Sequence, residues 1–250
     1  MIPKKIHFCW FGGNPYPQVV ETCIASWQKL MPDYELIEWN EKSFDIQSIQ
    51  FVQEAYESKK YAYVADYVRL YALYTQGGIY LDSDVEVVQS LNPFLSHQAF
   101  TGGENSDTCV TGTMGAVKGH PWIKLLLDYY EDKSFYTEQG QQTNTVIITD
   151  LTREIYGFTE SNQHRQLDDD LHIYPFEYFC AKDFESGMIN QTINTFTIHH
   201  FNGSWLSEQQ KKRHRKVLRY KHAINKLFGP NAFDQLNKTR KKLNSIKIFE

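Results

Sequence analysis

Two aspartates, Asp82 and Asp84, directly follow a short apolar segment in the sequence Gly-Gly-Ile-Tyr-Leu-Asp-Ser-Asp. On an extended chain, side chains two residues apart point to the same side, which places the carboxylates roughly 6–7 Å apart. Two such charges repel unless a cation lies near them, and carboxylate oxygens suit Mg²⁺ or Mn²⁺. An ion of this kind neutralises charge on a phosphate leaving group. The pair therefore predicts a divalent-cation site.

The bare D-x-D pattern is weak, because a chain with this aspartate content gives about 0.8 matches by chance. A second match, Asp168 and Asp170, lies in a polar Asp-Asp-Asp run that predicts a solvated acidic loop. The context of Asp82 and Asp84 is different, because a nearly uncharged helix, two glycines that are expected to cap it, and an apolar strand precede them.

The preceding helix carries only two charges between Tyr61 and Gln76, namely Asp66 and Arg69. They are three residues apart and so share one helical face. A buried charge is costly unless it is paired or used. Two interpretations stay open: a structural ion pair, or a polar group aimed at the hydroxyls of a ligand.

A third polar segment, Phe-Thr-Ile-His-His-Phe-Asn-Gly-Ser-Trp, spans residues 196–205. A histidine here offers a nitrogen ligand for the same cation. Gly203 lets the backbone approach a phosphate, and Ser204 and Trp205 can donate hydrogen bonds to it. The alternative is a strand and a turn with structural histidines.

The elements that position these residues alternate along the first half of the chain. The apolar pattern predicts strands over 6–10, 34–39 and 79–81, with 85–88 continuing the last, and helices over 19–30, 51–58, 61–76, 121–131 and 143–155. This alternation favours an α/β fold with a mostly parallel sheet. Ligands of such sheets lie at the carboxyl ends of strands, where Trp10 and the acidic pair fall.

Composition excludes several classes of protein. With 41% hydrophobic and 15% aromatic residues in 250, the chain is neither disordered nor collagen-like. It has no run of 18 apolar residues and no signal-peptide pattern, so we expect neither a membrane span nor secretion. Four scattered cysteines argue against a zinc site or a disulfide framework, and we expect a cytoplasmic protein with reduced thiols.

Charge divides the chain into two parts. Residues 1–205 hold 13 basic and 27 acidic residues, whereas residues 206–250 hold 13 basic and 3 acidic ones. We predict a catalytic domain over 1–205 and a basic helical extension over 206–250. Basic and apolar residues over 207–228 form an amphipathic pattern that suits an anionic membrane surface, or alternatively the acidic body. No reader motif accompanies the charge, so we do not expect nucleic-acid binding.

Several separated segments together resemble one family, the glycosyltransferases with a D-x-D sugar-binding region (family 32 type). That family includes bacterial capsular polysaccharide transferases and yeast initiating mannosyltransferases, with relatives among clostridial glucosylating toxins. The segments are 2–13, Ser26-Trp27, Pro32-Asp33-Tyr34 with Trp39, Ala65-Asp66-Tyr67 with Arg69, 77–84 and 200–205. Relatives often carry serine where this chain has Ala65, so one nucleotide contact is missing.

The resemblance implies a GT-A type nucleotide-sugar-binding fold and a retaining hexosyltransferase. The donor would be a nucleotide diphosphate sugar, most simply a UDP-sugar, and the cofactor Mn²⁺ or Mg²⁺. The acceptor would be a glycan or lipid-linked glycan in surface polysaccharide or capsule biosynthesis. Such an enzyme would be cytoplasmic and peripheral at the inner face of the membrane.

The resemblance also implies roles for individual residues. Trp10 would stack on the nucleobase, Tyr80 would pack near the ribose, and Gly203, Ser204 and Trp205 would face the diphosphate. Asp66 and Arg69 would hold the sugar hydroxyls. Asp82 would contact ribose and metal, Asp84 would bind the metal directly, and His200 would be the third ligand, with His199 as its rival. The catalytic set is thus Asp66, Arg69, Asp82 and Asp84.

Two rival functions come from other classes. A strand that ends in Asp82-x-Asp84-Val85 also suits the aspartyl-phosphate chemistry of a haloacid-dehalogenase-like phosphatase. A non-catalytic sugar- or metal-binding module is the second rival. If the chain is a glycosyltransferase, residues 106–113 and Thr143-Asn144 are candidate contacts to the sugar or the acceptor.

Overall fold

The computed structural model describes residues 1–110, 112–137, 142–184 and 186–202, and the short stretches 216–217, 220–221, 223–229 and 232–233. The chain divides into two compact units. The first unit comprises Met1–Asp183 and Ile189–Trp205, and the second comprises Phe184–Met188 and Leu206–Glu250. The predicted boundary after Trp205 falls where the second unit resumes.

The first unit contains the strands and helices that position the acidic pair. In chain order they are β1 (Lys5–Cys9), α1 (Gln18–Leu30), β2 (Glu35–Trp39), α2 (Gln50–Glu57), α3 (Tyr61–Gln76), β3 (Gly78–Leu81), β4 (Val85–Val87), η1 (Asn92–Phe94), β5 (Ala99–Gly102), β6 (Thr113–Ala116), α4 (Pro121–Asp128), α5 (Asn144–Tyr156), β7 (Arg165–Leu167), η2 (Asp168–Asp170), β8 (Leu171–Tyr174), α6 (Phe176–Phe179) and β9 (Thr197–His199). The five helices expected within residues 1–205 are all present, although α4 ends three residues early.

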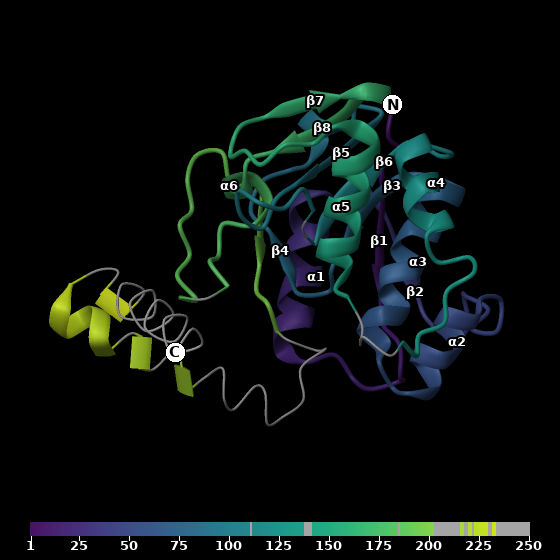
Figure 1. Cartoon of the computed structure of the whole chain (residues 1–250), viewed down its shortest axis with the longest axis horizontal. Helices are drawn as coiled ribbons and strands as arrows, with labels where there is room; N and C mark the ends of the chain where they lie inside the picture. The colour runs from purple at the N-terminus through teal and green to yellow at the C-terminus, as the bar shows by residue number, and fades with distance from the viewer. Residues whose placement is uncertain are drawn as a thin grey trace, which may run out of the picture. The chain divides into compact units, whose positions relative to one another are not determined.

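Seven strands form one sheet in the order β2-β1-β3-β6-β5-β8-β7 (Figure 1). Strand β1 is parallel to β2 and β3, and β5 is parallel to β8. Strands β6 and β7 run the other way. Five of the seven strands therefore share one direction, which confirms the predicted α/β fold with a mostly parallel sheet.

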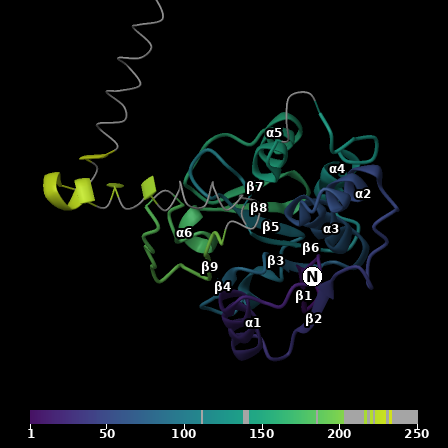
Figure 2. The same cartoon turned by 90° about the horizontal axis from the view of Figure 1, so that it is seen from below.

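Adjacent residues of a central strand pack into different hydrophobic cores, one on each side of the sheet. Figure 2 shows α1 on one side of the sheet and α2, α3, α4 and α5 on the other. Ile79 and Leu81 pack with Trp27 of α1, whereas Tyr80 packs with Val68 of α3. Because side chains alternate along a strand, the next residue on the Tyr80 side is Asp82. The pleat thus directs Asp82 toward α3.

Two glycines connect α3 to β3. Gly77 ends the helix, and its N–H donates to the Leu73 carbonyl at 2.9 Å, as the predicted glycine cap requires. Gly77 has a φ of 67° and Gly78 one of 118°, a region that other residues rarely adopt. This turn lets a buried helix lead directly into a buried strand that ends at the acidic pair.

The prediction that 85–88 continues the strand is wrong. After β3 the chain turns at Asp82, where the Val85 N–H donates to the Asp82 carbonyl at 2.9 Å. Strand β4 then pairs with β9 in a separate antiparallel sheet, with Val85 opposite His199. The acidic pair therefore lies in a tight turn, not on an extended segment, and the histidine segment lies beside it.

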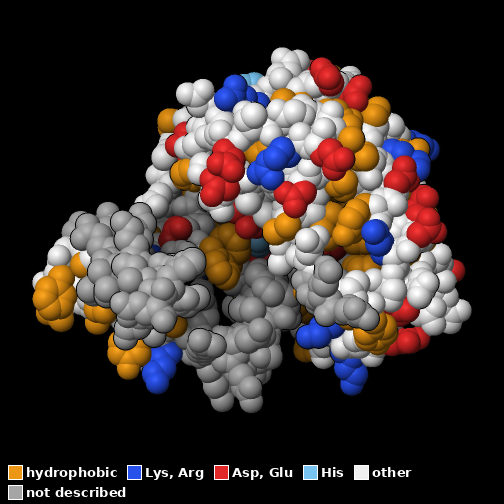
Figure 3. All heavy atoms as spheres, in the orientation of Figure 1, with side chains coloured by type: hydrophobic (Ala, Val, Ile, Leu, Met, Phe, Trp, Pro, Cys, Tyr) orange, Lys and Arg blue, Asp and Glu red, His pale blue; other side chains and the backbone are white. Residues whose placement is uncertain are grey.

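The described part of the second unit includes helical residues at 216–217, 220–221 and 223–228. Val217, Tyr220, Leu227 and Phe228 are exposed there. Most of 206–250 lies outside the described residues, so the basic helical extension stays a prediction. Among the helices that the structure describes, none is both long and apolar enough to cross a membrane. On the face seen in Figure 3, basic and acidic side chains are interspersed.

Candidate active site

Arg69 joins the helix to the strand end. Its Nη2 lies 3.0 Å from Asp66 Oδ1 and 3.1 Å from Asp82 Oδ1. The guanidinium lies over the Tyr80 ring, 4.7 Å from its centroid. The ion pair that the sequence left open is therefore formed, and it is shared with the D-x-D motif. Such shared pairing fixes the Asp82 carboxylate, which remains 22% exposed.

Tyr80 contacts both Asp82 and Arg69 and helps to hold them in place. Its hydroxyl donates to Asp82 Oδ1 at 3.1 Å, and the residue is only 1% exposed. Tyr80 therefore orients Asp82 and Arg69. Its packing near a ribose, which the resemblance implies, stays a prediction.

Asp84 is enclosed by the chain that follows β9. His199 Nε2 lies 3.3 Å from Asp84 Oδ1, and the Asn202 N–H donates to Asp84 Oδ2 at 2.6 Å. Burial alone would raise the pKa of Asp84, but the His199 charge and the Asn202 hydrogen bond lower it to about 2. Asp84 is consequently ionised at any physiological pH.

Of the two adjacent histidines, His199 faces the carboxylates. Its Nε2 also lies 3.9 Å from Asp82 Oδ2, and it is 4% exposed. His200 Nε2 instead pairs with Glu86 Oε2 at 2.8 Å. Adjacent residues of a strand point to opposite sides, so only one of the two can face Asp84. The structure brings the rival, His199, to the place that the sequence analysis gave to His200.

The described donor atoms suit a hard divalent cation. Asp82 and Asp84 offer carboxylate oxygens, and His199 offers an imidazole nitrogen, a mixture that Mn²⁺ or Mg²⁺ accepts. The Asp84–His199 separation of 3.3 Å is close to the spacing of about 3 Å between neighbouring ligands of an octahedral ion. His199 Nδ1 is buried without a hydrogen-bond partner. The donor set therefore fits a divalent cation by its chemistry, whereas the only described group whose ligand atoms all lie within 4.8 Å of one another is His97, Asp170 and His172.

Asn144 of α5 approaches the other end of the site. Its Nδ2 donates to Asp66 Oδ1 at 2.9 Å, so one of the candidate sugar contacts does reach the charged cluster. Burial raises the pKa of Asp66 to about 6, although Arg69 and the Asn144 amide act in the opposite direction. The described residues of 106–110 and 112–113 include no such contact to Asp66.

Two residues that adjoin the site were not singled out by the sequence analysis, although Gly112 lies within the candidate segment 106–113. Glu104 follows β5, and burial raises the pKa of its carboxyl, on which the His199, Asp82 and Arg69 charges also act. Gly112 precedes β6, and a Cβ placed there would lie 2.8 Å from Asp82 Oδ2. Both positions follow from the strand order alone, so no sequence signal marks them.

Trp10 lies at the carboxyl end of β1, beside β3 in the sheet. Its indole Nε1 donates to the Asn14 carbonyl at 2.6 Å, and its ring packs edge-on against Tyr16 at 5.2 Å. The half-buried ring keeps an accessible face at the strand end. Stacking on a nucleobase stays a prediction. Gly203, Ser204 and Trp205 lie outside the described residues.

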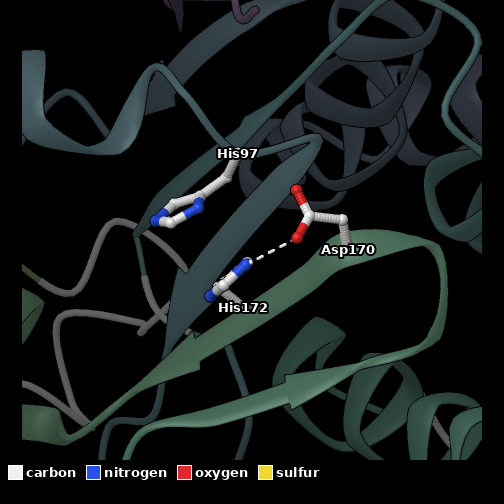
Figure 4. Close-up of side chains that lie close together, drawn as sticks. All are labelled: His97, Asp170 and His172. Atoms are coloured by element: carbon white, nitrogen blue, oxygen red, sulfur yellow. Dashed lines mark hydrogen bonds and ion pairs between the residues drawn. The ribbon is translucent and has the colours of Figure 1, made fainter.

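A second cluster of metal-ligand side chains lies where β5 and β8 begin, at the end of the parallel strands opposite to the acidic pair (Figure 4). His172 Nε2 bonds Asp170 at 2.9 Å and its Nδ1 bonds His164 at 2.9 Å. The His97 and His172 rings are stacked at 3.7 Å with 22° between planes. Nitrogen lone pairs lie in the ring plane, so stacked rings do not converge on one ion. Asp170, expected in a solvated loop, instead belongs to this hydrogen-bonded cluster.

Comparisons with known proteins agree with the site. Residues 17–101 match the family model described as "Glycosyltransferase sugar-binding region containing DXD motif". Inositol phosphoceramide mannosyltransferase 3 of Schizosaccharomyces pombe is 35% identical over 126 residues, which are 49% of this chain and 35% of that protein. Subversion of eukaryotic traffic protein A of Legionella pneumophila is 32% identical over 165 residues, covering 52% of this chain and 25% of that protein.

The chain thus spans about a third or less of the length of these two relatives. Among solved structures, the PaToxG glycosyltransferase aligns over 61% of this chain and 68% of its own, with 18% identity and a TM-score of 0.48. The segment that matches the family model, residues 17–101, contains Asp66, Arg69, Asp82 and Asp84. The match and the relatives confirm the resemblance to glycosyltransferases with a DXD sugar-binding region and support a glycosyltransferase function for this chain.

Proposed function

We propose that this chain transfers a sugar from a nucleotide diphosphate sugar to a glycan or lipid-linked acceptor, with a divalent cation in the site. The observation that carries the proposal is the linked set Asp66–Arg69–Asp82–His199–Asp84. It joins a cation site at one end to buried hydrogen-bonding groups at the other. A donor that has both phosphates and hydroxyls suits such a site.

Asp82, Asp84 and His199 would hold the cation, with Mn²⁺ as our first choice and Mg²⁺ as the second. When bound, the ion supplies positive charge that stabilises the departing diphosphate. The residues of the chain have separate tasks. Arg69 and Tyr80 fix the position of Asp82, and the Asn202 N–H fixes that of Asp84.

The polar groups on the α3 side would orient the sugar. Within the described part of the chain, the hydrogen bonds that Arg69 and Asn144 donate to Asp66 both end on Oδ1. Its Oδ2 is therefore available to accept a hydroxyl. Holding the sugar between fixed groups reduces the entropy lost on reaching the transition state. Trp10 at the neighbouring strand end would stack on the nucleobase, as the resemblance implies.

We propose retention of anomeric configuration, in line with the resemblance. The bond from the anomeric carbon to the diphosphate oxygen breaks, and the acceptor oxygen bonds the same face of that carbon. The acceptor proton passes to the departing diphosphate oxygen. An NMR assignment of the product's anomeric linkage checks this step, and a product with the inverted linkage would contradict it.

The donor and the acceptor are proposed by class. The UDP-sugars come from the resemblance, whereas the printed name of the fission yeast relative describes mannosyl transfer to inositol phosphoceramide. Both UDP-sugars and GDP-mannose therefore belong in a donor panel. A lipid-linked acceptor, as in surface polysaccharide biosynthesis, is our proposal for the second substrate. A cytoplasmic enzyme would meet such an acceptor at the inner face of a membrane.

The test measures nucleotide release from UDP- and GDP-sugars with Mn²⁺, with Mg²⁺ and with a chelator. We expect metal-dependent release from one donor and a loss of about a hundredfold or more in Asp84→Ala. Asp168→Ala is the matched control, because it changes the exposed second D-x-D match and should retain activity. No release and no Mn²⁺-dependent nucleotide binding would refute the proposal. Phosphate release from p-nitrophenyl phosphate would then favour the phosphatase.

A further inference from the structure

Asn144 is an unusual residue at its position. It is the first residue of α5 and is 9% exposed, although asparagine is mostly a surface residue. An asparagine near a helix start normally bonds a free backbone N–H. Here the side chain instead reaches across to α3 and donates from Nδ2 to Asp66 Oδ1 at 2.9 Å. The residue therefore serves the site and not the helix end.

The bond to Asp66 fixes the orientation of the amide. An ionised carboxylate only accepts hydrogen bonds, so the NH₂ group must face Asp66 and the carbonyl oxygen must face away. Arg69 donates to the same Asp66 oxygen at 3.0 Å, which further fixes the carboxylate. The direction in which Asn144 offers its oxygen is thus set before any ligand binds.

Asn144 Oδ1 has no hydrogen-bond partner although it is buried. Within the residues that the structure describes, only one other buried side-chain atom shares this condition, His199 Nδ1. The two atoms lie at opposite ends of one chain of contacts, from Asn144 through Asp66, Arg69 and Asp82 to His199. Buried polar atoms are nearly always paired, so a ligand in this site is the natural partner of Asn144 Oδ1.

We propose that Asn144 Oδ1 accepts a hydrogen bond from a hydroxyl of the transferred sugar and thereby helps to select the donor. The proposal rests on the proposed function and names a subsite within it. A diphosphate carries acceptors and no donor at neutral pH, so it cannot complete this oxygen. Asp66 and Arg69 separate Asn144 from the cation end, where the phosphates would lie. Because Asn144 contacts Asp66, which would hold the sugar hydroxyls, we assign the donating hydroxyl to the transferred sugar and not to the ribose.

Such a contact discriminates strongly between sugars. A site that hydrogen-bonds a hydroxyl rejects the analogue without it, because the buried protein group is then left unpaired. An epimer that moves the hydroxyl away should be rejected for the same reason. Asn144 would consequently select for one hydroxyl of the transferred sugar and would not contribute to recognition of the nucleotide.

The test uses calorimetric titration of UDP-glucose and GDP-mannose, of their 2-, 3-, 4- and 6-deoxy analogues, and of UDP and GDP, all with Mn²⁺. In the wild type we expect one deoxy analogue to bind at least about tenfold more weakly than its parent. In Asn144→Ala the parent should weaken by a similar factor, and the difference between parent and analogue should disappear. Affinity for UDP or GDP should not change.

Two further variants keep the test decisive. Asn144→Ser retains a hydroxyl that can donate to Asp66 but shortens the acceptor, so it should reproduce the loss even if alanine prevents folding. Val146→Ala, at an exposed position of the same helix, should behave as the wild type. Unchanged discrimination in both Asn144 variants, or equal weakening of UDP and GDP, would overturn the proposal. Absence of any nucleotide binding by the wild type would instead refute the proposed function.

Discussion

At the scale of single residues, the buried acids of the site differ in how their charge is stabilised. Asp84 has a histidine and a backbone N–H beside it, and its pKa is lowered to about 2. For Asp66, burial is the largest influence and raises the pKa to about 6 despite Arg69. Ionised Asp66 is therefore held at a cost in stability, as is common for residues kept for function.

This difference predicts how stability depends on pH. The pKa of Asp66 is higher in the folded chain than the value of 3.8 for an unperturbed aspartate. Between these values the folded state binds more protons, so the free energy of unfolding falls as pH rises from about 4 to 6. The shift corresponds to about 3 kcal/mol at most. Asp66→Asn lacks this titration and should gain stability relative to the wild type as pH rises.

Urea denaturation of both proteins between pH 4 and 7.5 measures the effect. The stability difference between Asp66→Asn and the wild type should grow up to about pH 6 and remain constant above it. The variant should also lose affinity for the nucleotide sugar, since its amide is uncharged. A difference that does not vary with pH would show that Asp66 is ionised throughout and is stabilised by Arg69 alone.

The sequence predicted residue types better than residue contacts. Asp66 and Arg69 were found because their spacing places them on one face of a helix, whereas Asp82 and Asp84 were found on an extended geometry that the turn replaces. His199 was left as a rival because strand parity lets one histidine face the acids but does not say which. That choice depends on the pairing of Val85 with His199. Asn144 reaches Asp66 from 78 residues away, a contact that no local pattern encodes.

At the scale of elements, the position of Asp82 depends on the strand that passes beside it. Strand β6 pairs with β3, and Leu81 lies opposite Thr113. Gly112 therefore packs against the turn, where a Cβ would lie 2.8 Å from Asp82 Oδ2 and 2.9 Å from Val85 Cγ2. The absence of a side chain at Gly112 leaves the room that the acidic turn occupies.

Gly112→Ala should consequently displace Asp82 while retaining the sheet. We expect nucleotide release to fall by about a hundredfold, because a displacement of about 1 Å in an active site has that effect. Overpacking should lower stability by about 1–3 kcal/mol. Gly119→Asn is the control, since its Cβ would meet nothing within 4 Å and asparagine tolerates a positive φ. Wild-type activity in Gly112→Ala would show that Asp82 has freedom to move.

Helices and strands were predictable where the apolar pattern and the residues that end an element, such as glycine, agreed. The helix over 61–76 and its glycine cap were read directly, because an uncharged helical pattern stops at Gly77. Strand β4 was misread as part of β3, since both are apolar and only three residues separate them. The pairing of β4 with β9 is a contact between distant segments, and it converts an expected extended segment into a turn.

At the scale of the whole molecule, the match to the sugar-binding region ends at residue 101, yet the site extends beyond it. Asn144 and His199, which complete the two ends of the charged cluster, come from later in the chain. The part of the chain after residue 205 has a different character, with 13 basic residues in 45 positions. Its charge suits an anionic partner, and we propose a membrane surface for residues 207–228, where a lipid-linked acceptor would be found.

Binding to vesicles distinguishes the membrane from the acidic body as that partner. Each basic residue near an anionic surface contributes about 1 kcal/mol, and salt screens the attraction. The full chain should co-sediment with phosphatidylserine-containing vesicles at low salt and much less in 0.5 M salt, as expected for a Debye length of roughly 4–5 Å. Vesicles of phosphatidylcholine alone should bind little of it.

The decisive variant replaces Lys211, Lys212, Arg213, Arg215 and Lys216 with glutamine in the full chain and keeps the apolar positions. Loss of vesicle binding, with donor hydrolysis unchanged, would place the membrane contact in the extension and separate it from the active site. Residues 1–205 alone should bind no vesicles, because their net charge is −14. If the wild type fails to bind at low salt while the variant loses stability, the extension instead packs on the acidic body, because only that partner would make its charge part of the fold.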